Sequence, residues 1–359
     1  MAVTSEGGRP TTGPRRLGGW VRVATIVAVM AVVAVAAVFF LRQGHKPLRI
    51  VVLADSLTEG MGEVTDLRRT WPHLVGDQLR IERGEAAGSG GTWLPASVSG
   101  PMFGFTAGRP GEGSWSALNE SGVPGSIARG PVTWDTSRYD SAVVHIGAER
   151  AGQRFTASSG GAEVTFTSTE EGTASFVVDK LGPELTVSGE GTVLGVLGRS
   201  GSGSIDVYNL AWAGSSTKDW LGWAGRPALL PLLREIDPDV VVLSLAGNDL
   251  WQGVSAGDFA DNLGRLHKLV GEVAPRARWV LGTQPVADNT PREQWMAYQQ
   301  KVIDYATELN APLINLVDTM PGYSGGPFFY AADHAHLTDA GHALEAGEAG
   351  PAIRRALLP

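Results

Sequence analysis

The sequence predicts an α/β fold of three layers (α/β/α), in which helices cover both faces of a parallel sheet. Short, continuous runs of branched apolar residues recur along the chain, as expected for strands that are buried on both faces. Amphipathic stretches of helical length alternate with these runs, which is typical of a parallel sheet. The interval 84–203 breaks this rhythm with closely spaced short strands and Gly-rich turns, and it predicts an inserted antiparallel β-sandwich.

The composition is that of a globular protein and excludes several classes of function. The chain has 359 residues, of which 43% are hydrophobic and 18% are charged. Its formal net charge of -8 provides no basic surface for phosphate backbones, so we expect no nucleic-acid partner. The absence of cysteine from the sequence excludes disulfides and thiolate metal sites.

Three segments precede the predicted globular body. Residues 1–19 are rich in Gly, Pro, Thr and Arg and predict a disordered tail. Residues 20–42 contain the charge-free apolar run Val23–Leu41, which at ~1.5 Å per residue can cross most of a hydrocarbon core. We interpret 20–42 as a transmembrane anchor, because a buried core helix would have no obvious core to join there, and 43–47 as a linker.

The anchor predicts a single-pass protein of the cell membrane. The apolar run continues beyond the small residues Ala34 and Ala36, which favours an uncleaved anchor over a cleaved signal peptide. Basic residues flank the run on both sides in similar number. We expect the N-terminus inside and the body outside the cell.

The α/β body has a first part at 48–83 and a second part at 204–359. Its expected strands are Leu48–Leu53, Ile205–Ala211, Val240–Leu245, Trp279–Gly282 and Leu313–Val317. Its expected helices are 67–81, 218–234, 257–274 and 291–309.

Between these two parts, the insert has expected strands of its own at Ala142–Ile146, Ala162–Thr167, Ala174–Val178, Leu185–Val187 and Val193–Leu197. Trp93, Trp115 and Trp134 of the insert either fill its core or stack on sugar rings.

Polar and small residues follow the predicted strands of the body. Open α/β sheets bind ligands beyond the carboxyl ends of their strands, so these segments are the candidate site. They are Ala54–Gly60 with Ser56, Asn209–Thr217 with Gly214, Ala246–Asp249 with Asn248, and the C-terminal segment Asp333–His342 with His336.

With these four blocks in this order, the chain resembles the SGNH, or GDSL, hydrolase family from about Leu48 to its end, the insert excepted. The resemblance implies a flavodoxin-like sheet and a serine esterase that works through an acyl-enzyme. It implies Ser56 as the nucleophile, His336 as the base and Asp333 as the carboxylate that orients the imidazole. It also implies an oxyanion hole made by the backbone N–H groups of Ser56 and Gly214 and by the side-chain amide of Asn248.

Two positions depart from the family pattern, which usually has Gly where this chain has Ala54 and Ala246. Alanine resists positive φ, so the turn or the pocket could differ slightly, but no reacting group is lost.

Rival interpretations of single residues are weaker. Asp55 and Asp249 could form a carboxylate pair, but local hydrogen-bonding roles fit better. His334 and His342 lack a recognised zinc spacing, so we expect no metal. Ser324 lies in Gly-x-Ser-x-Gly, but within a Gly- and Pro-rich loop rather than at the strand-to-helix turn that this motif requires.

We therefore expect an esterase that removes acetyl groups from an extracellular or cell-wall carbohydrate and needs no cofactor. The alternatives are a lipase, lysophospholipase or thioesterase, an acyltransferase, and a non-catalytic glycan-binding surface protein. Proteins of the family with a β-sandwich between the first two blocks look similar in layout, which favours a glycan ester as substrate. The sequence leaves the oligomeric state open.

Overall fold

The computed structural model describes residues 46–97, 108–111, 115–116, 118–288 and 290–358. The predicted tail, the predicted anchor and most of the predicted linker lie outside these ranges, so the anchor stays a prediction. No helix within the described ranges is both long and apolar enough to cross a membrane. Residues 47–359 form one compact unit.

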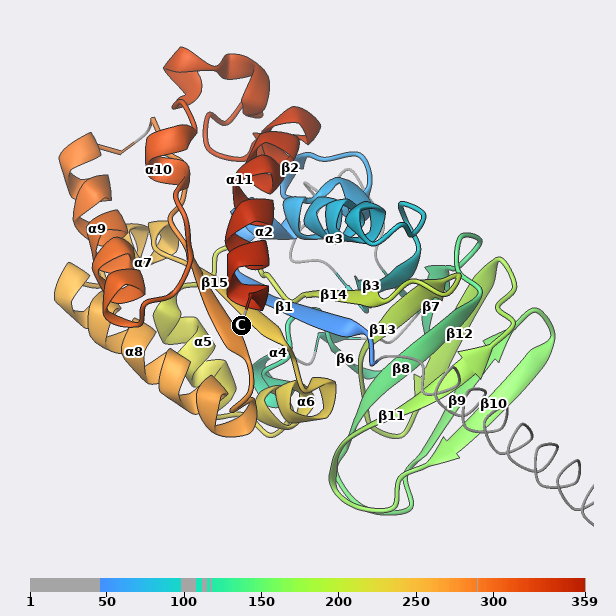
Figure 1. The fold of residues 1–359 in the computed structure, drawn as a ribbon. Coiled ribbons are helices and arrows are strands. Elements are labelled where there is room, and N and C mark those ends of the chain that lie inside the picture. Colours follow the sequence, from blue (N-terminus) through green and yellow to red (C-terminus); the bar gives the residue numbers. More distant parts are fainter. Residues whose placement is uncertain (1–45, 98–107, 112–114, 117, 289, 359) are drawn as a thin grey trace, which may run out of the picture. The chain divides into compact units, whose positions relative to one another are not determined.

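An eleven-stranded sheet forms the centre of this unit (Figure 1). Its body strands lie in the order β14-β1-β15-β16-β17, and each pairs in parallel with its neighbours. In chain order this is 2-1-3-4-5, the flavodoxin-like arrangement, and it confirms the predicted parallel sheet. The strands are β1 (Leu48–Ala54), β14 (Ile205–Asn209), β15 (Val240–Ser244), β16 (Arg278–Gly282) and β17 (Leu313–Ile314).

Helices cover both faces of the body sheet, as predicted (Figure 1). The alternation of side chains along a strand divides β1 between two cores. Ile50 and Val52 pack with apolar residues of α3 (Trp71–Glu82) and α11 (Asp339–Leu357). Val51 and Leu53 pack on the opposite face with residues of four helices, α5 (Thr217–Ala224), α6 (Leu229–Ile236), α8 (Ala256–Val273) and α9 (Arg292–Glu308).

Two predicted elements differ in detail from the structure. The single helix expected at 218–234 is two helices, α5 and α6, because Pro227 lies between them and cannot continue the hydrogen bonding of α5. The strand expected at Leu313–Val317 pairs only over Leu313–Ile314 and then turns into the short helix α10 (Leu316–Thr319).

The described residues of the interval 84–203 form two layers of strands, one of which continues the body sheet. Four of its strands continue the central sheet in the order β11-β8-β13-β3, with β3 beside β14. A second sheet has the order β10-β9-β12-β7-β4, and a buried apolar cluster that includes Trp134, Val144 and Phe155 contains residues of both sheets. The interpretation of 84–203 as a separate inserted domain stays a prediction. The four strands that continue the central sheet are β3 (Gly90–Pro95), β8 (Ser141–Ala148), β11 (Gly172–Asp179) and β13 (Thr192–Ser200). The short elements β5 (Trp115–Ser116), α4 (Leu118–Ser121) and β6 (Ile127–Arg129) lie between β3 and β8 in the chain. The strands of the second sheet are β4 (Arg109–Pro110), β7 (Val132–Asp135), β9 (Arg154–Ser159), β10 (Ala162–Thr167) and β12 (Glu184–Gly189).

Two of the three insert tryptophans belong to the core. Trp93 and Trp134 are each 1% exposed, so neither is available to stack on a sugar ring. The side chain of Trp115 lies outside the described part of the chain.

Short elements follow the carboxyl ends of the body strands, where ligands of such sheets bind. They are α2 (Ser56–Glu59) and β2 (Gly62–Glu63) after β1, α7 (Gly247–Trp251) after β15, and, before α11, the 3-10 turns η2 (Tyr323–Gly325) and η3 (Pro327–Phe329) and the strand β18 (Leu337–Thr338). A further 3-10 turn, η1 (Leu67–Arg69), precedes α3.

Candidate active site

Ser56 lies where β1 turns into the one-turn helix α2. Asp55 caps this helix, because its Oδ1 accepts a hydrogen bond from the Leu57 backbone N–H at 3.1 Å. Gly60 ends the helix with a φ of 102°, a left-handed conformation that suits glycine. The strand end and the two caps thus fix Ser56, which is 6% exposed.

His336 and Asp333 complete a hydrogen-bonded chain with Ser56. The His336 Nε2 lies 2.8 Å from the Ser56 Oγ, and the His336 Nδ1 lies 2.5 Å from the Asp333 Oδ2. A neutral imidazole that donates from Nδ1 to the carboxylate presents Nε2 as an acceptor for the serine hydroxyl. The structure therefore brings the three residues together in the order that proton transfer from the serine requires.

A tight turn holds Asp333 against His336. The Asp333 Oδ1 accepts hydrogen bonds from the backbone N–H groups of Ala335 at 3.0 Å and His336 at 2.9 Å. Partial burial of this carboxyl favours its neutral form, but the hydrogen bonds from the His336 side chain and from the two backbone groups outweigh it. The pKa of Asp333 is therefore lower than usual, and the carboxylate stays ionised beside the imidazole.

A two-stranded parallel ladder ties the serine segment to the histidine segment. Gly62 pairs with Leu337 and Glu63 pairs with Thr338. Gly62 has a φ of +121°, and a Cβ at this position would lie 2.9 Å from the Leu337 carbonyl oxygen and 3.0 Å from the His336 Cβ. Only glycine lets the chain after Ser56 approach His336 this closely.

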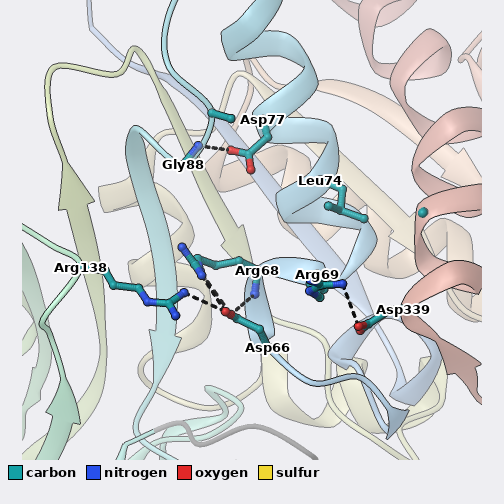
Figure 2. A pocket seen from close by; sticks show the side chains of 10 residues that line it. Asp66, Arg68, Arg69, Leu74, Asp77, Gly88, Arg138 and Asp339 are labelled. Atoms are coloured by element: carbon teal, nitrogen blue, oxygen red, sulfur yellow. Dashed lines mark hydrogen bonds and ion pairs between the residues drawn. The ribbon is translucent and has the colours of Figure 1, made fainter.

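Asp339 at the start of α11 makes a second set of contacts between the segment after Ser56 and the segment after His336. Its carboxylate accepts hydrogen bonds from Thr65 and forms an ion pair with Arg69 at 3.0 Å (Figure 2). Asp339 also lines a cavity of about 530 Å³ with other charged residues. Each of the three arginines that line this cavity forms an ion pair with an aspartate (Figure 2). Arg69 pairs with Asp339, and both Arg68 and Arg138 pair with Asp66.

The predicted oxyanion donors lie at neighbouring strand ends. The Asn248 Nδ2 donates to the Asp55 Oδ2 at 3.2 Å and to the carbonyl oxygen of Ser215 at 3.1 Å. Asn248 thus contacts the residues next to Ser56 and Gly214, so the segments of the three expected donors meet. Both amide hydrogens have acceptors in this arrangement, and donation to an oxyanion requires one of them to be shared or released.

Asp55 is a buried carboxylate at the centre of the site. It is 2% exposed, and its Oδ2 accepts hydrogen bonds from Asn248 and, at 2.7 Å, from the Gln284 Nε2. Burial raises the pKa of Asp55 to about 6, although the hydrogen bonds from Gln284 and Leu57 and the nearby His336 act in the opposite direction.

Sequence reasoning missed Gln284, although a signal was present. Gln284 follows the predicted strand Trp279–Gly282, so the strand-end argument that selects Ser56 and Asn248 also applies to it.

The rival carboxylates and histidines have structural partners. The Asp249 carboxylate accepts hydrogen bonds from the backbone and hydroxyl of Thr217, as expected for a local role. His334 stacks on Tyr323 with ring centroids 3.6 Å apart. His342 is buried and accepts the Trp71 N–H, and burial lowers its pKa to about 3. Within the described residues, no cluster of three His, Cys, Asp or Glu side chains forms a metal site.

The competing serine lies in a different environment from Ser56. Ser324 belongs to the 3-10 turn η2, and its hydroxyl donates to the Asp288 Oδ2 at 2.6 Å. An acceptor carboxylate rather than an imidazole faces this hydroxyl, and no strand leads directly into the turn. The local geometry does not fit a nucleophile elbow.

The two alanines that depart from the family pattern are compatible with their backbone. Ala54 is the last residue of β1, and Ala246 has an extended φ of 174°. Neither position has the positive φ that would favour glycine.

The fold and the Ser-His-Asp arrangement at the sheet edge are those of a serine hydrolase. A family model described as GDSL-like lipase/acylhydrolase matches residues 155–344, which is just over half of the chain. The protein therefore belongs to this family, and it is an ester-hydrolysing serine hydrolase. The matched segment contains Gly214, Asn248, Asp333 and His336 and begins after Ser56.

Three solved structures are similar to this chain to different degrees, and the first of them shares its fold. One, described as a peptidoglycan O-acetylesterase in action, has a TM-score of 0.66 and 17% identity and covers 87% of this chain and 92% of its own. TesA has a TM-score of 0.44 and 14% identity, with 86% and 99% covered. A family two carbohydrate esterase from Clostridium thermocellum in complex with cellohexaose has a TM-score of 0.33 and 15% identity, with 64% and 93% covered. The curated protein sequences contain no match to this chain.

We predict that Gly62→Ala lowers kcat for an ester substrate by roughly one to two orders of magnitude, because the added Cβ displaces His336 from Ser56. Steady-state kinetics measure this change. Gly152→Ala is the matched control, since Gly152 also has a positive φ, of +83°, but has open space around it. Equal kcat values in the two variants would contradict the role of Gly62.

The pKa of Asp55 predicts a pH dependence of stability. In the folded protein this pKa is about 6, above its ordinary value of 3.8, so the folded state binds more protons than the unfolded state between these values. Stability therefore rises as the pH falls through about 6. Relative to Asp55→Asn, the parent protein gains roughly 2 to 3 kcal/mol of unfolding free energy between pH 7.5 and pH 4. Urea denaturation across this range measures it, and parallel pH profiles of the two proteins would contradict the assignment.

Proposed function

We propose that this protein is an O-acetylesterase that removes acetyl groups from an extracellular or cell-wall glycan. The hydrogen-bonded chain Ser56–His336–Asp333 at the carboxyl edge of the sheet is the observation on which this proposal rests. This arrangement gives a serine hydroxyl a base at 2.8 Å and gives that base a carboxylate partner.

In the proposed reaction, the His336 Nε2 takes the proton of the Ser56 hydroxyl as Oγ attacks the acetyl carbonyl carbon. The charge that develops on the carbonyl oxygen is stabilised by the backbone N–H groups of Ser56 and Gly214 and by the Asn248 amide. His336 then gives the proton to the sugar oxygen, which leaves as a hydroxyl. A water molecule, activated by the same imidazole, releases acetate from Ser56.

The carbohydrate part of the proposal has two supports. The solved structure described as a peptidoglycan O-acetylesterase shares the fold over most of both chains. In addition, Trp251 is 46% exposed at the end of α7, the helix that contains Asn248. Its ring is fixed by a hydrogen bond from Nε1 to the Thr290 Oγ1 at 2.9 Å and by Trp295, whose ring centroid is 5.8 Å away. A fixed, exposed indole suits the apolar face of a sugar ring.

The proposed cellular location is supported by the sequence alone. An anchor at 20–42 with its N-terminus inside holds the hydrolase outside the cell membrane, where cell-wall and extracellular glycans occur. Protease digestion of intact cells tests this proposal, because an exposed body is degraded and an internal one is protected.

We predict that Ser56→Ala and His336→Ala each lower kcat/KM for p-nitrophenyl acetate by about three orders of magnitude or more, since each change removes a member of the proposed triad. Ser324→Ala is the control and keeps the activity of the parent. A parent protein that is no faster than Ser56→Ala would exclude catalysis by this site. A panel of longer acyl chains separates acetylesterase from lipase or thioesterase, because a lipase cleaves the longer chains faster.

For an O-acetylated glycan, we predict that Trp251→Ala raises KM roughly three- to tenfold, the size of one lost aromatic contact. The KM for p-nitrophenyl acetate stays unchanged, because this substrate has no sugar ring. Trp251→Phe, which keeps an aromatic face, retains most of the binding. An equal change in KM for both substrates would contradict a sugar-binding role of Trp251.

A further inference from the structure

Gln284 joins the ends of three strands by hydrogen bonds. It lies two residues after the end of β16, and its Nε2 donates to the Asp55 Oδ2 at 2.7 Å, beside the end of β1. Its Oε1 accepts the backbone N–H of Gly247 at 2.7 Å, after β15. One side-chain amide thus holds the residue before Ser56 and the residue before Asn248.

A second glutamine holds the backbone of Gln284. The Gln284 backbone N–H donates to the Oε1 of Gln299 on α9 at 2.9 Å. Gln284 is 1% exposed and Gln299 is fully buried. The buried Gln284 side-chain amide is hydrogen-bonded at both its oxygen and its nitrogen, so it cannot rotate without leaving a donor or an acceptor unpaired.

We propose that Gln284 is a positioning residue for the oxyanion hole, which orients the Asn248 amide through Asp55 on one side and through Gly247 on the other. This inference rests on the proposed function of Ser56 and Asn248. The side chain of Gln284 contacts Asp55 and Gly247 and none of the atoms that react in the proposed mechanism. Its two side-chain hydrogen bonds fix the position of Asp55 relative to the Gly247–Asn248 turn.

The chemistry of Asp55 explains why an amide is needed at position 284. The Asp55 Oδ2 accepts from both Gln284 and Asn248, so it must offer lone pairs to two donors. A carboxylate at position 284 would face Asp55 as a like charge, and an apolar side chain would remove a donor. Either change favours protonation of Asp55, because the hydrogen bond from Gln284 is among the contacts that lower its pKa. A proton on Oδ2 would compete with Asn248 for the same oxygen.

The test compares the full chain with Gln284→Met and Gln284→Glu. Methionine keeps the approximate volume but removes both hydrogen bonds, whereas glutamate keeps an acceptor for Gly247 and tests the pair with Asp55. Gln153→Met is the matched control, because Gln153 is also buried and also bridges two backbone groups, the Glu149 N–H and the Glu190 carbonyl oxygen, in the sandwich. Two measurements are made on each protein: the titration of the Asp55 carboxyl by NMR with ¹³C-labelled aspartate, and kcat and KM for p-nitrophenyl acetate.

The expected result is a higher pKa of Asp55 in both Gln284 variants and a kcat lower by about tenfold or more, with KM nearly unchanged. Gln153→Met leaves both measurements as in the parent. An unchanged Asp55 titration would overturn the inference, whatever the kinetics, and so would a parental kcat in both variants. If Gln284→Met does not fold, Gln284→Glu decides by the same measurements. A failure of the proposed function shows separately, as a parent protein whose activity does not depend on Ser56. The role of Gln284 at an oxyanion hole would then be overturned as well, even if the Asp55 titration still showed the contact between Gln284 and Asp55.

Discussion

The geometry of the site depends on the hydrogen bonds that the buried carboxylate of Asp55 accepts. Hydrogen bonds reach it from Leu57, Asn248 and Gln284, which follow three different strands of the sheet. Burial disfavours the charge of this group, so each donor stabilises an ion that would otherwise take up a proton. A parallel sheet brings the strand ends to one edge, but strand ends alone do not fix side chains. Because Leu57, Asn248 and Gln284 all donate to Asp55 just after β1, their positions relative to one another are fixed.

The pairing of Ser56 with His336 needs a second constraint, because 280 positions separate them in the chain. The ladder between β2 and β18 provides it and starts only six residues after the serine and one residue after the histidine. Gly62 makes this ladder possible by leaving room for the His336 Cβ. Asp339 adds a contact to Thr65 and Arg69 just beyond the ladder, so two sets of contacts hold the chain that follows His336.

Much of the fold could be predicted from the sequence because its signals are local. Buried apolar runs predicted β1, β14, β15 and β16, and alternation predicted β8, β10, β11, β12 and β13 of the insert but not β3, β7 or β9. Ser56, Asn248 and His336 were found because they follow strands or match the motif blocks of a family. Sheet order along the insert could not be predicted, since pairing of β3 with β14 joins residues far apart in the chain. Gly62 and Gln284 were missed for a related reason, because their importance lies in what approaches them. The Leu337 carbonyl oxygen and the His336 Cβ approach Gly62, and the Asp55 carboxylate approaches Gln284.

The central claim is that the environment of Ser56, rather than that of Ser324, makes a nucleophile. The most direct measurement is reaction of the full chain with a fluorophosphonate, which forms a bond to an activated serine oxygen as fluoride leaves, followed by mass spectrometry of the digested protein. The account predicts one adduct per chain, on the peptide that contains Ser56, because His336 accepts the Ser56 proton at 2.8 Å. An adduct on the peptide that contains Ser324, or no adduct at all, would contradict it.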